Sequence, residues 1–243
     1  MEKEFLDENE IRLSGMINNP VLSVKGDGAV YSNGDAPLTL GLVRADVGVE
    51  DQLSFNGEVL EATMQRDGNS ATSDPIEFTH SYQYFKYSNK TVHFASWSPY
   101  VRDSYINGQV DFGIDGTTDI MYGSPVSGTK EKGFAPIVFN HALVKFKVWA
   151  YAMVPVNEVT GEELYQPDDK WGKITSLTVN NVPVTYTIKL PGTYDVESSG
   201  TNEGYLFEVG SDKQNLGFDL ISPISLPKSF DSRAAVTEFM IPD

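Results

Sequence analysis

Apolar and polar residues alternate with a period of two in several separate runs, which is the pattern of half-buried β-strands. The earliest clear run has one face made of Ile11, Leu13, Gly15 and Ile17. Later runs with the same alternation cover residues 78–84, 91–97, 144–150 and 184–190. Gly, Pro, Asn and Asp residues separate the runs and supply turns. Helical periodicity is scarce, so the pattern predicts an all-β chain of antiparallel sheets packed as sandwiches.

Residues 123–136 are rich in Gly, Pro and Ser and carry no periodicity, so they are the favoured domain boundary. This boundary predicts an N-terminal sandwich over residues 1–133 and a C-terminal sandwich over residues 134–243. A second break covers residues 155–172, and we interpret it as an excursion inside the second domain. A rival boundary near residue 155 stays open.

The strand that follows the predicted boundary changes its inward face between Leu143 and Val144. A shift of one residue turns every later side chain to the opposite face of a strand. The change of parity therefore predicts a β-bulge or a crossover between sheets at this point.

Charge and composition narrow the function classes. The 243 residues include 34 Asp and Glu against 18 Lys and Arg, a formal net charge of −16. A chain this acidic is repelled by phosphate backbones, so we expect no nucleic-acid binding. The sequence holds no Cys, which excludes disulfides, thiolate metal sites and cysteine nucleophiles. No apolar run approaches the length of a membrane span, and the start of the chain lacks the apolar centre of a signal peptide.

Catalytic motifs are weak throughout. None of the histidines, His80, His93 and His141, has the spacing that brings two imidazoles to one metal. His80 and His141 share faces with Phe78 and Phe139, which favours half-buried strand positions. The sequence has no G-x-S-x-G elbow and no Walker loop. We therefore expect no enzyme activity and no cofactor.

Two acidic clusters stand beside glycines. One is Asp27 with Asp35, and the other is Asp111, Asp115 and Asp119. Calcium favours several oxygens from a glycine-containing loop, but neither stretch has the EF-hand pattern. The favoured interpretation is solvated turn carboxylates, and no metal is assigned.

Residues 82–87, YQYFKY, form the densest aromatic run. Such a run is typical of sheet packing, because aromatic side chains suit half-buried pleated surfaces. A sugar-stacking platform is the alternative.

Three segments together resemble a known family. They are TVHFASWSPY at residues 91–100, TDIMYG at 118–123 and IVFNHALVKFKVW at 137–149. The F-x-H-A-L portion of the third is the most specific, and residues 11–14 and 174–190 also fit. The chain resembles the fimbrillin-like proteins of Bacteroidales, the subunits of type V pili.

This resemblance implies two tandem transthyretin-like antiparallel β-sandwich domains. It implies export to the cell surface as an outer-membrane lipoprotein, with contact to the membrane only through an N-terminal lipid on a Cys that this sequence lacks. It also implies assembly by donor-strand exchange, in which a protease removes the first strand and a neighbour's terminal strand replaces it. The expected partners are other fimbrial subunits, with host or bacterial surface glycans or proteins as further candidates.

The strand-exchange mechanism assigns roles to particular residues. Ile11, Leu13 and Ile17 would be the first-strand plug. At the C-terminus, the run 236–241 has one face apolar enough to dock, made of Thr237, Phe239 and Ile241. Whether this run is a donor strand or an ordinary last strand stays open.

Removal of the first strand requires a cut beyond Ile17. Lys25 and Arg44 are the basic residues between that strand and Asp46. A trypsin-like processing enzyme would use one of them, and we favour Arg44 over Lys25.

Two functions stay open. The first is a structural fimbrial subunit or tip adhesin that supports cell adhesion and assembles by strand exchange. The alternative is a surface lipoprotein that binds carbohydrate and never polymerises.

Overall fold

The computed structural model describes residues 9–18, 37–46, 55, 57–65, 73–80, 82–86, 90–192 and 204–242. Contacts divide the chain into two units that interleave along the sequence. Unit 1 contains Met1–Gly113, Asp119–Leu143 and Thr185–Val209. Unit 2 contains Ile114–Thr118, Val144–Val184 and Gly210–Asp243.

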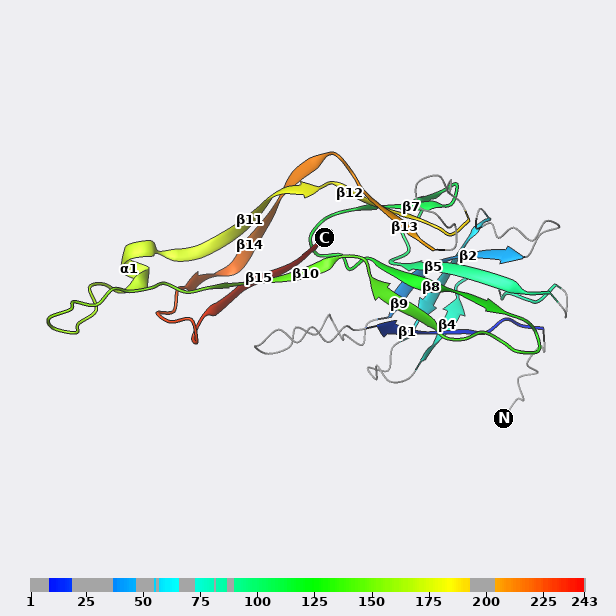
Figure 1. Cartoon of the computed structure of the whole chain (residues 1–243), viewed down its shortest axis with the longest axis horizontal. Coiled ribbons are helices and arrows are strands. Elements are labelled where there is room, and N and C mark those ends of the chain that lie inside the picture. Colours follow the sequence, from blue (N-terminus) through cyan, green and yellow to red (C-terminus); the bar gives the residue numbers. More distant parts are fainter. Residues whose placement is uncertain are drawn as a thin grey trace. The chain divides into compact units, whose positions relative to one another are not determined.

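Unit 1 is built around a sheet that closes on itself in the order β1-β4-β3-β2-β5-β8-β9 (Figure 1). Its strands are β1 (Leu13–Asn18), β2 (Leu38–Asp46), β3 (Val59–Met64), β4 (Asp74–Phe78), β5 (Val92–Ser98), β8 (Met121–Gly128) and β9 (Ile137–His141). All neighbours pair antiparallel except β1 and β9, which pair parallel.

This parallel pair corrects the prediction of purely antiparallel sheets. Antiparallel neighbours are favoured where a short turn joins the strands, whereas β1 and β9 are far apart in the sequence. The direction of β1 is therefore not constrained by a hairpin with β9. The all-β prediction is confirmed, and the one α-helix in the described part of the chain is the five-residue α1 (Pro167–Trp171).

The inward faces of the closed sheet form one apolar core. Its buried members are Ile11, Leu13, Leu40, Leu42, Ala62, Met64, Ile76, Val92, Phe94, Met121, Val126, Ile137 and Phe139. Phe134 packs on this core edge-to-face with Phe94, at 5.5 Å between ring centroids, and stacks on Phe85 at 5.9 Å. The core therefore depends on side chains from every strand of the closed sheet.

Unit 1 also has a four-stranded sheet in the order β13-β12-β7-β6. These strands are β6 (Tyr105–Ile106), β7 (Gln109–Gly113), β12 (Thr185–Lys189) and β13 (Leu206–Val209). Just before β13, the Tyr205 hydroxyl donates to the Gly123 carbonyl at 2.7 Å and accepts from the Ser96 N–H at 3.1 Å. It binds where the β5–β8 register shifts, so a side chain hydrogen-bonds to backbone groups at this irregularity.

Unit 2 has two separate two-stranded antiparallel sheets. One pairs β10 (Val144–Ala150) with β15 (Ala234–Ile241), and the other pairs β11 (Lys173–Pro183) with β14 (Lys213–Ser225). Phe239 stacks on Phe146 and on Phe218, with centroid distances of 5.4 and 5.6 Å. Large apolar side chains of this unit such as Met153, Val159 and Trp171 are exposed.

The predicted change of sheet between Leu143 and Val144 is confirmed. β9 belongs to the closed sheet and β10 to a separate sheet, and the chain passes from unit 1 to unit 2 at this bond. The parity change in the sequence marks this crossover because each sheet needs its own buried face.

The boundary stretch 123–136 begins inside β8, and the strand after it, β9, pairs with both β8 and β1. No single position in the sequence therefore separates unit 1 from unit 2, because each unit contains three separate ranges. The division into domains 1–133 and 134–243 stays a prediction.

Gly41 tests how tightly the closed sheet is packed. A Cβ at this position would lie 2.3 Å from Cε2 of Trp97, a fully buried ring. Gly41→Ala should lower the free energy of unfolding by about 1–3 kcal/mol, because overpacking forces side chains and backbone to shift. Gly113→Ala is the matched control, since nothing lies within 4 Å of its Cβ position, and should stay within about 0.5 kcal/mol. Urea denaturation measures both, and equal losses would contradict this packing.

Candidate functional site

The candidate site is the position that the first strand occupies in unit 1, which we call the first-strand seat. On one side β1 pairs antiparallel with β4, with Leu13 opposite Ile76. On the other side it pairs parallel with β9, with Gly15 opposite Ile137. The seat is therefore a slot between two strands, and its occupant completes both ladders.

The pairing continues ahead of β1 along residues 83–85. The Ile11 N–H donates to the Gln83 carbonyl at 2.7 Å, and the Phe85 N–H donates to the Asn9 carbonyl at 2.9 Å. Glu10 and Tyr84 form the antiparallel bridge between these bonds. The occupied length of the seat therefore runs from residue 9 to residue 18.

The occupant contributes apolar side chains to the core. Ile11 is 2% exposed and Leu13 is 4% exposed. Ile17 is partly buried and packs against the same core cluster. Their burial agrees with the apolar strand face that the alternation predicts. Their role as a removable plug stays a prediction.

Polar contacts hold the two ends of the occupant. Asn18 Nδ2 donates to Asn140 Oδ1 at 2.8 Å, and Lys130 Nζ donates to Asn9 Oδ1 at 2.9 Å. Hydrogen bonds at exposed positions add little net stability, because water competes for both partners. Their geometric effect is to favour one register of β1 in the slot.

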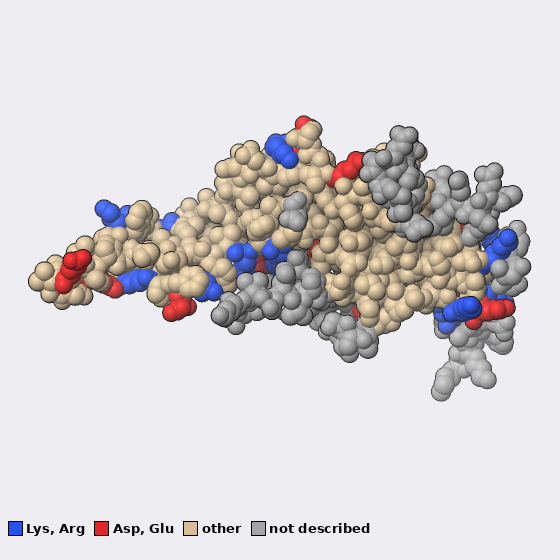
Figure 2. All heavy atoms as spheres, viewed as in Figure 1, with Lys and Arg blue, Asp and Glu red and all other residues tan. Residues whose placement is uncertain are grey.

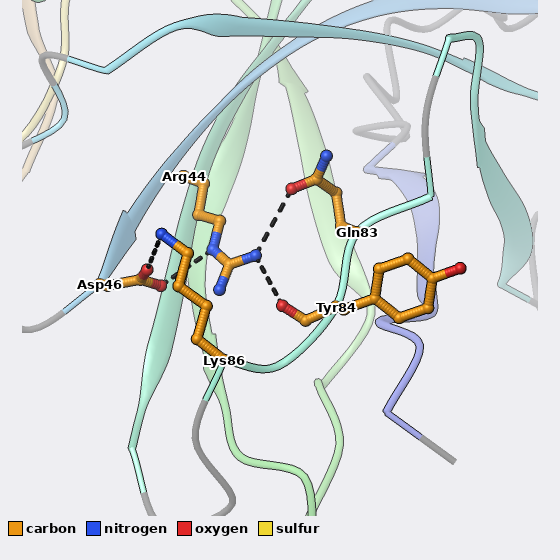
Figure 3. A network of polar contacts seen from close by, with 5 residues as sticks. All are labelled: Arg44, Asp46, Gln83, Tyr84 and Lys86. Atoms are coloured by element: carbon orange, nitrogen blue, oxygen red, sulfur yellow. Dashed lines mark hydrogen bonds and ion pairs between the residues drawn. The ribbon is translucent and has the colours of Figure 1, made fainter. Parts of the chain in front are cut away.

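A polar network centred on Arg44 fixes the segment that borders the N-terminal half of the seat (Figure 3). Arg44 Nη1 donates to the Tyr84 carbonyl at 2.9 Å and to Gln83 Oε1 at 3.4 Å. Arg44 Nε donates to Asp46 Oδ1 at 2.9 Å, and Lys86 Nζ lies 3.4 Å from Asp46 Oδ2. Arg44 thus links β2 to the segment on which residues 9–11 lie.

Arg44 lies within β2 opposite Phe94 of β5, and the β2–β3 ladder ends one residue before it, at Val43. Its side chain is 13% exposed. Arg44 is therefore not in an exposed loop, and its local sequence does not reveal the strand that pairs with it. Processing at Arg44 stays a prediction and requires β2 to open first, since proteases need accessible backbone. Lys25 lies outside the described residues.

The face predicted to act as a C-terminal donor lies in β15, which pairs with β10 along its length. Phe239 is buried, while Thr237 and Ile241 are half-buried. Val236 and Met240, on the opposite face, are also buried. In this structure the run has an intramolecular partner, and its use as a donor stays a prediction.

The histidines lie in three separate environments. His141 Nδ1 contacts Asp119 Oδ1 at 2.9 Å, and His80 Nε2 lies 3.4 Å from Glu61. His93 Nδ1 lies 2.6 Å from Ser127 Oγ. Burial lowers the pKa of His93, against the opposing charge of Asp46.

The Asp111, Asp115 and Asp119 carboxylates also have separate partners. Asp115 accepts from the backbone N–H groups of Thr117 and Thr118, both at 2.7 Å. Desolvation opposes ionisation of Asp115, but these bonds and the Thr118 hydroxyl outweigh it and lower its pKa. Asp111 accepts from the Thr187 hydroxyl at 2.6 Å. Within the described residues, no group of three His, Cys, Asp or Glu could hold a metal ion, and Asp27 and Asp35 lie outside them.

The aromatic run divides between packing and exposure. Phe85 stacks on Phe134 in the core, as the packing interpretation expects. Tyr82 is 69% exposed and Tyr84 is 43% exposed.

On the face that Figure 2 shows, acidic and basic side chains lie singly or in small groups of both signs, with wide uncharged areas between them.

Sequence reasoning did not identify residues 83–85 as a neighbour of the first strand, nor the close packing at Gly15. The alternation signal that located the first strand was available, but it carries no information on distant partners. Gly15 was visible as a glycine on the apolar face, and such a position signals close approach of other atoms.

Comparison with known proteins gives structural likeness only. No family model matches the chain, and no curated protein matches it. A solved structure of a candidate cell adhesion protein from Bacteroides uniformis aligns over 95% of this chain and 74% of its own, with 16% identity and a TM-score of 0.51. A candidate cell adhesion protein from Bacteroides ovatus aligns over 96% and 87%, with 12% identity and a TM-score of 0.44. A fimbrial assembly protein from Parabacteroides distasonis aligns over 96% and 86%, with 12% identity and a TM-score of 0.39. The first of these matches shows a shared fold.

A search of the described residues for helices of membrane-spanning length and hydropathy found none.

Leu13 tests how much the first strand contributes to the core. Leu13→Ala should lower the free energy of unfolding by about 2–5 kcal/mol, through lost transfer energy and the cavity left behind. Arg12→Ala is the control, because the Arg12 side chain is 58% exposed, and it should cost less than about 0.5 kcal/mol. Urea denaturation measures the free energy of unfolding of both variants. A decrease in Leu13→Ala as small as that in the control would refute the burial of Leu13 in the core.

Arg44 tests the support of residues 83–85. Arg44→Gln should speed amide hydrogen exchange at Ile11 and Phe85 by about tenfold or more, because a charge-assisted bond to the Tyr84 carbonyl is lost. Lys86→Gln is the control, since Lys86 contacts Asp46 at the surface without binding this backbone. Unchanged exchange at both amides in Arg44→Gln would contradict the network's role.

Proposed function

We propose that this chain is a structural fimbrial subunit or tip adhesin that supports cell adhesion and assembles by protease-triggered donor-strand exchange. In this proposal it is not an enzyme, and its two domains are tandem transthyretin-like sandwiches. It acts at the cell surface as an outer-membrane lipoprotein, and its partners are other fimbrial subunits and surface glycans or proteins. The fold shared with a candidate cell adhesion protein supports the adhesion role.

The observation that carries the proposal is the first-strand seat. One short strand completes both the β4 and the β9 ladders and contributes Ile11 and Leu13 to the core. Without it, two strand edges and an apolar slot would face water. An incoming strand with alternate apolar side chains can satisfy both the backbone and the slot.

Removal of the first strand also leaves the rest of the core in place. The remaining core members come from β2, β3, β4, β5, β8 and β9, which still pair in sequence around the sheet. The vacated slot would therefore have preformed walls, which lowers the ordering cost of binding a new strand.

The seat can be tested in a full chain nicked at an engineered protease site between Asn18 and Pro37. A labelled peptide of residues 10–18 should replace the nicked first strand and comigrate with the protein on native gels. The same peptide with Leu13→Asp should fail, because a carboxylate would enter an apolar slot unpaired. Equal incorporation of the two peptides, or no incorporation of the native one, would contradict strand exchange at this seat.

A non-polymerising carbohydrate-binding lipoprotein is the second candidate function. The observation that favours it is the pair of exposed aromatic side chains Tyr82 and Tyr84, since exposed rings can stack on sugars. Glycan-array binding by the intact chain that is lost in Tyr82→Ala would support this alternative. An array with no bound glycan would count against it.

A further inference from the structure

We propose that the first-strand seat selects its occupant by a size limit at the position of Gly15. The partner is then a strand of a different subunit that carries glycine at this position between aliphatic residues. This inference rests on the proposed function and specifies which strand the seat accepts.

The limit comes from three groups around Gly15. A Cβ there would lie 2.7 Å from Met64 Sδ, 3.0 Å from Phe139 Cε2 and 3.3 Å from the Ile137 carbonyl oxygen. Each distance is shorter than ordinary carbon contact. A side chain of any size at this position therefore displaces a neighbour.

The neighbours have little room to move. Met64, Phe139 and Ile137 are fully buried, and all three belong to the core of the closed sheet. Met64 is flexible and can give way to one methyl group at a cost. The Ile137 carbonyl belongs to the β9 backbone, and the Phe139 ring is held by the packed core. We expect alanine to be tolerated poorly and branched side chains to be excluded.

Glycine in the interior of a strand is otherwise unfavourable, because it adds conformational entropy to the unfolded chain and packs no side chain. Its presence in β1 is explained by the close approach of Met64 and Phe139. The seat thus requires an occupant with aliphatic side chains at the positions of Ile11, Leu13 and Ile17, and with glycine at the position of Gly15.

The C-terminal run of a second copy does not fit this pattern. Residues 236–241, VTEFMI, contain no glycine. If Thr237, Phe239 and Ile241 took the places of residues 13, 15 and 17, Phe239 would stand where Gly15 stands. The first strand of a second copy has the right pattern, but the proposed processing removes it. The occupant is therefore a strand of another subunit.

The test uses the nicked full chain and labelled peptides of residues 10–18 that differ at one position. Gly15→Ala should bind about tenfold or more weakly than the native peptide, and Gly15→Val should not bind measurably. The control peptide is Met16→Val, which adds the same β-branched residue to the half-buried opposite face and should bind within about threefold of native. Since valine favours strands over glycine, weaker binding of Gly15→Val cannot come from strand propensity.

The outcomes separate the two proposals. Binding of the Gly15→Val peptide as tight as that of the native peptide would overturn the size limit and leave strand exchange standing. Failure of the native peptide to enter would overturn both. A peptide of residues 234–242 is expected not to enter, and its entry as tightly as the native peptide would also overturn the size limit.

A nicked Met64→Ala chain provides a second measurement. Removing the Met64 side chain relieves the shortest of the three contacts at Gly15, so the Gly15→Ala peptide should lose less affinity relative to the native peptide in this chain than in the unsubstituted one. An unchanged preference for glycine in this chain would contradict the assignment of the limit to Met64.

Discussion

The structure of unit 1 depends on the closure of its main sheet, and closure depends on β1. The ladder order places β1 between β4 and β9, and among the described residues no other strand joins these two edges. A strand edge left open exposes unpaired backbone groups, which either bind water or recruit another strand. Because the inner face of this slot is apolar, water cannot replace the buried side chains of β1 without a loss of free energy. An occupied seat is therefore the stable condition of the unit.

Besides the backbone ladders, two kinds of side-chain contact hold the occupant, and they have different consequences. Burial of Ile11 and Leu13 stabilises the occupant, since the gain from apolar burial scales with the area removed from water. The polar contacts of Asn9 and Asn18 at its ends, together with the Arg44-supported segment, favour one register. A replacement strand can reproduce the apolar burial with any suitable aliphatic residues at these positions. The polar contacts depend on the particular residues at the two ends of the strand.

The sequence predicts the local features of this arrangement well. Period-two alternation identifies β1, β5, β10 and β12, the buried face of β1 and the crossover after Leu143, because these depend on neighbouring residues. The predicted run 78–84 is wrong as a strand, since β4 ends at Phe78. It does not predict that β1 lies parallel to β9 or that Arg44 lies in a strand paired with β5. Both depend on partners distant in sequence, and a period of two is the same for parallel and antiparallel neighbours. A glycine on the apolar face signals close approach at Gly15, but the alternation does not identify Met64 and Phe139 as the residues that approach it.

The central claim is that β1 is a separable member of an otherwise cooperative sheet, and native-state hydrogen exchange under increasing urea tests it most directly. The amides of β1 are expected to exchange through an opening whose free energy is smaller than that of β2 and β5, with a weaker dependence on urea. Exchange of β1, β2 and β5 amides with the same free energy and the same urea dependence would show that β1 leaves only when the whole unit unfolds, and would contradict the account.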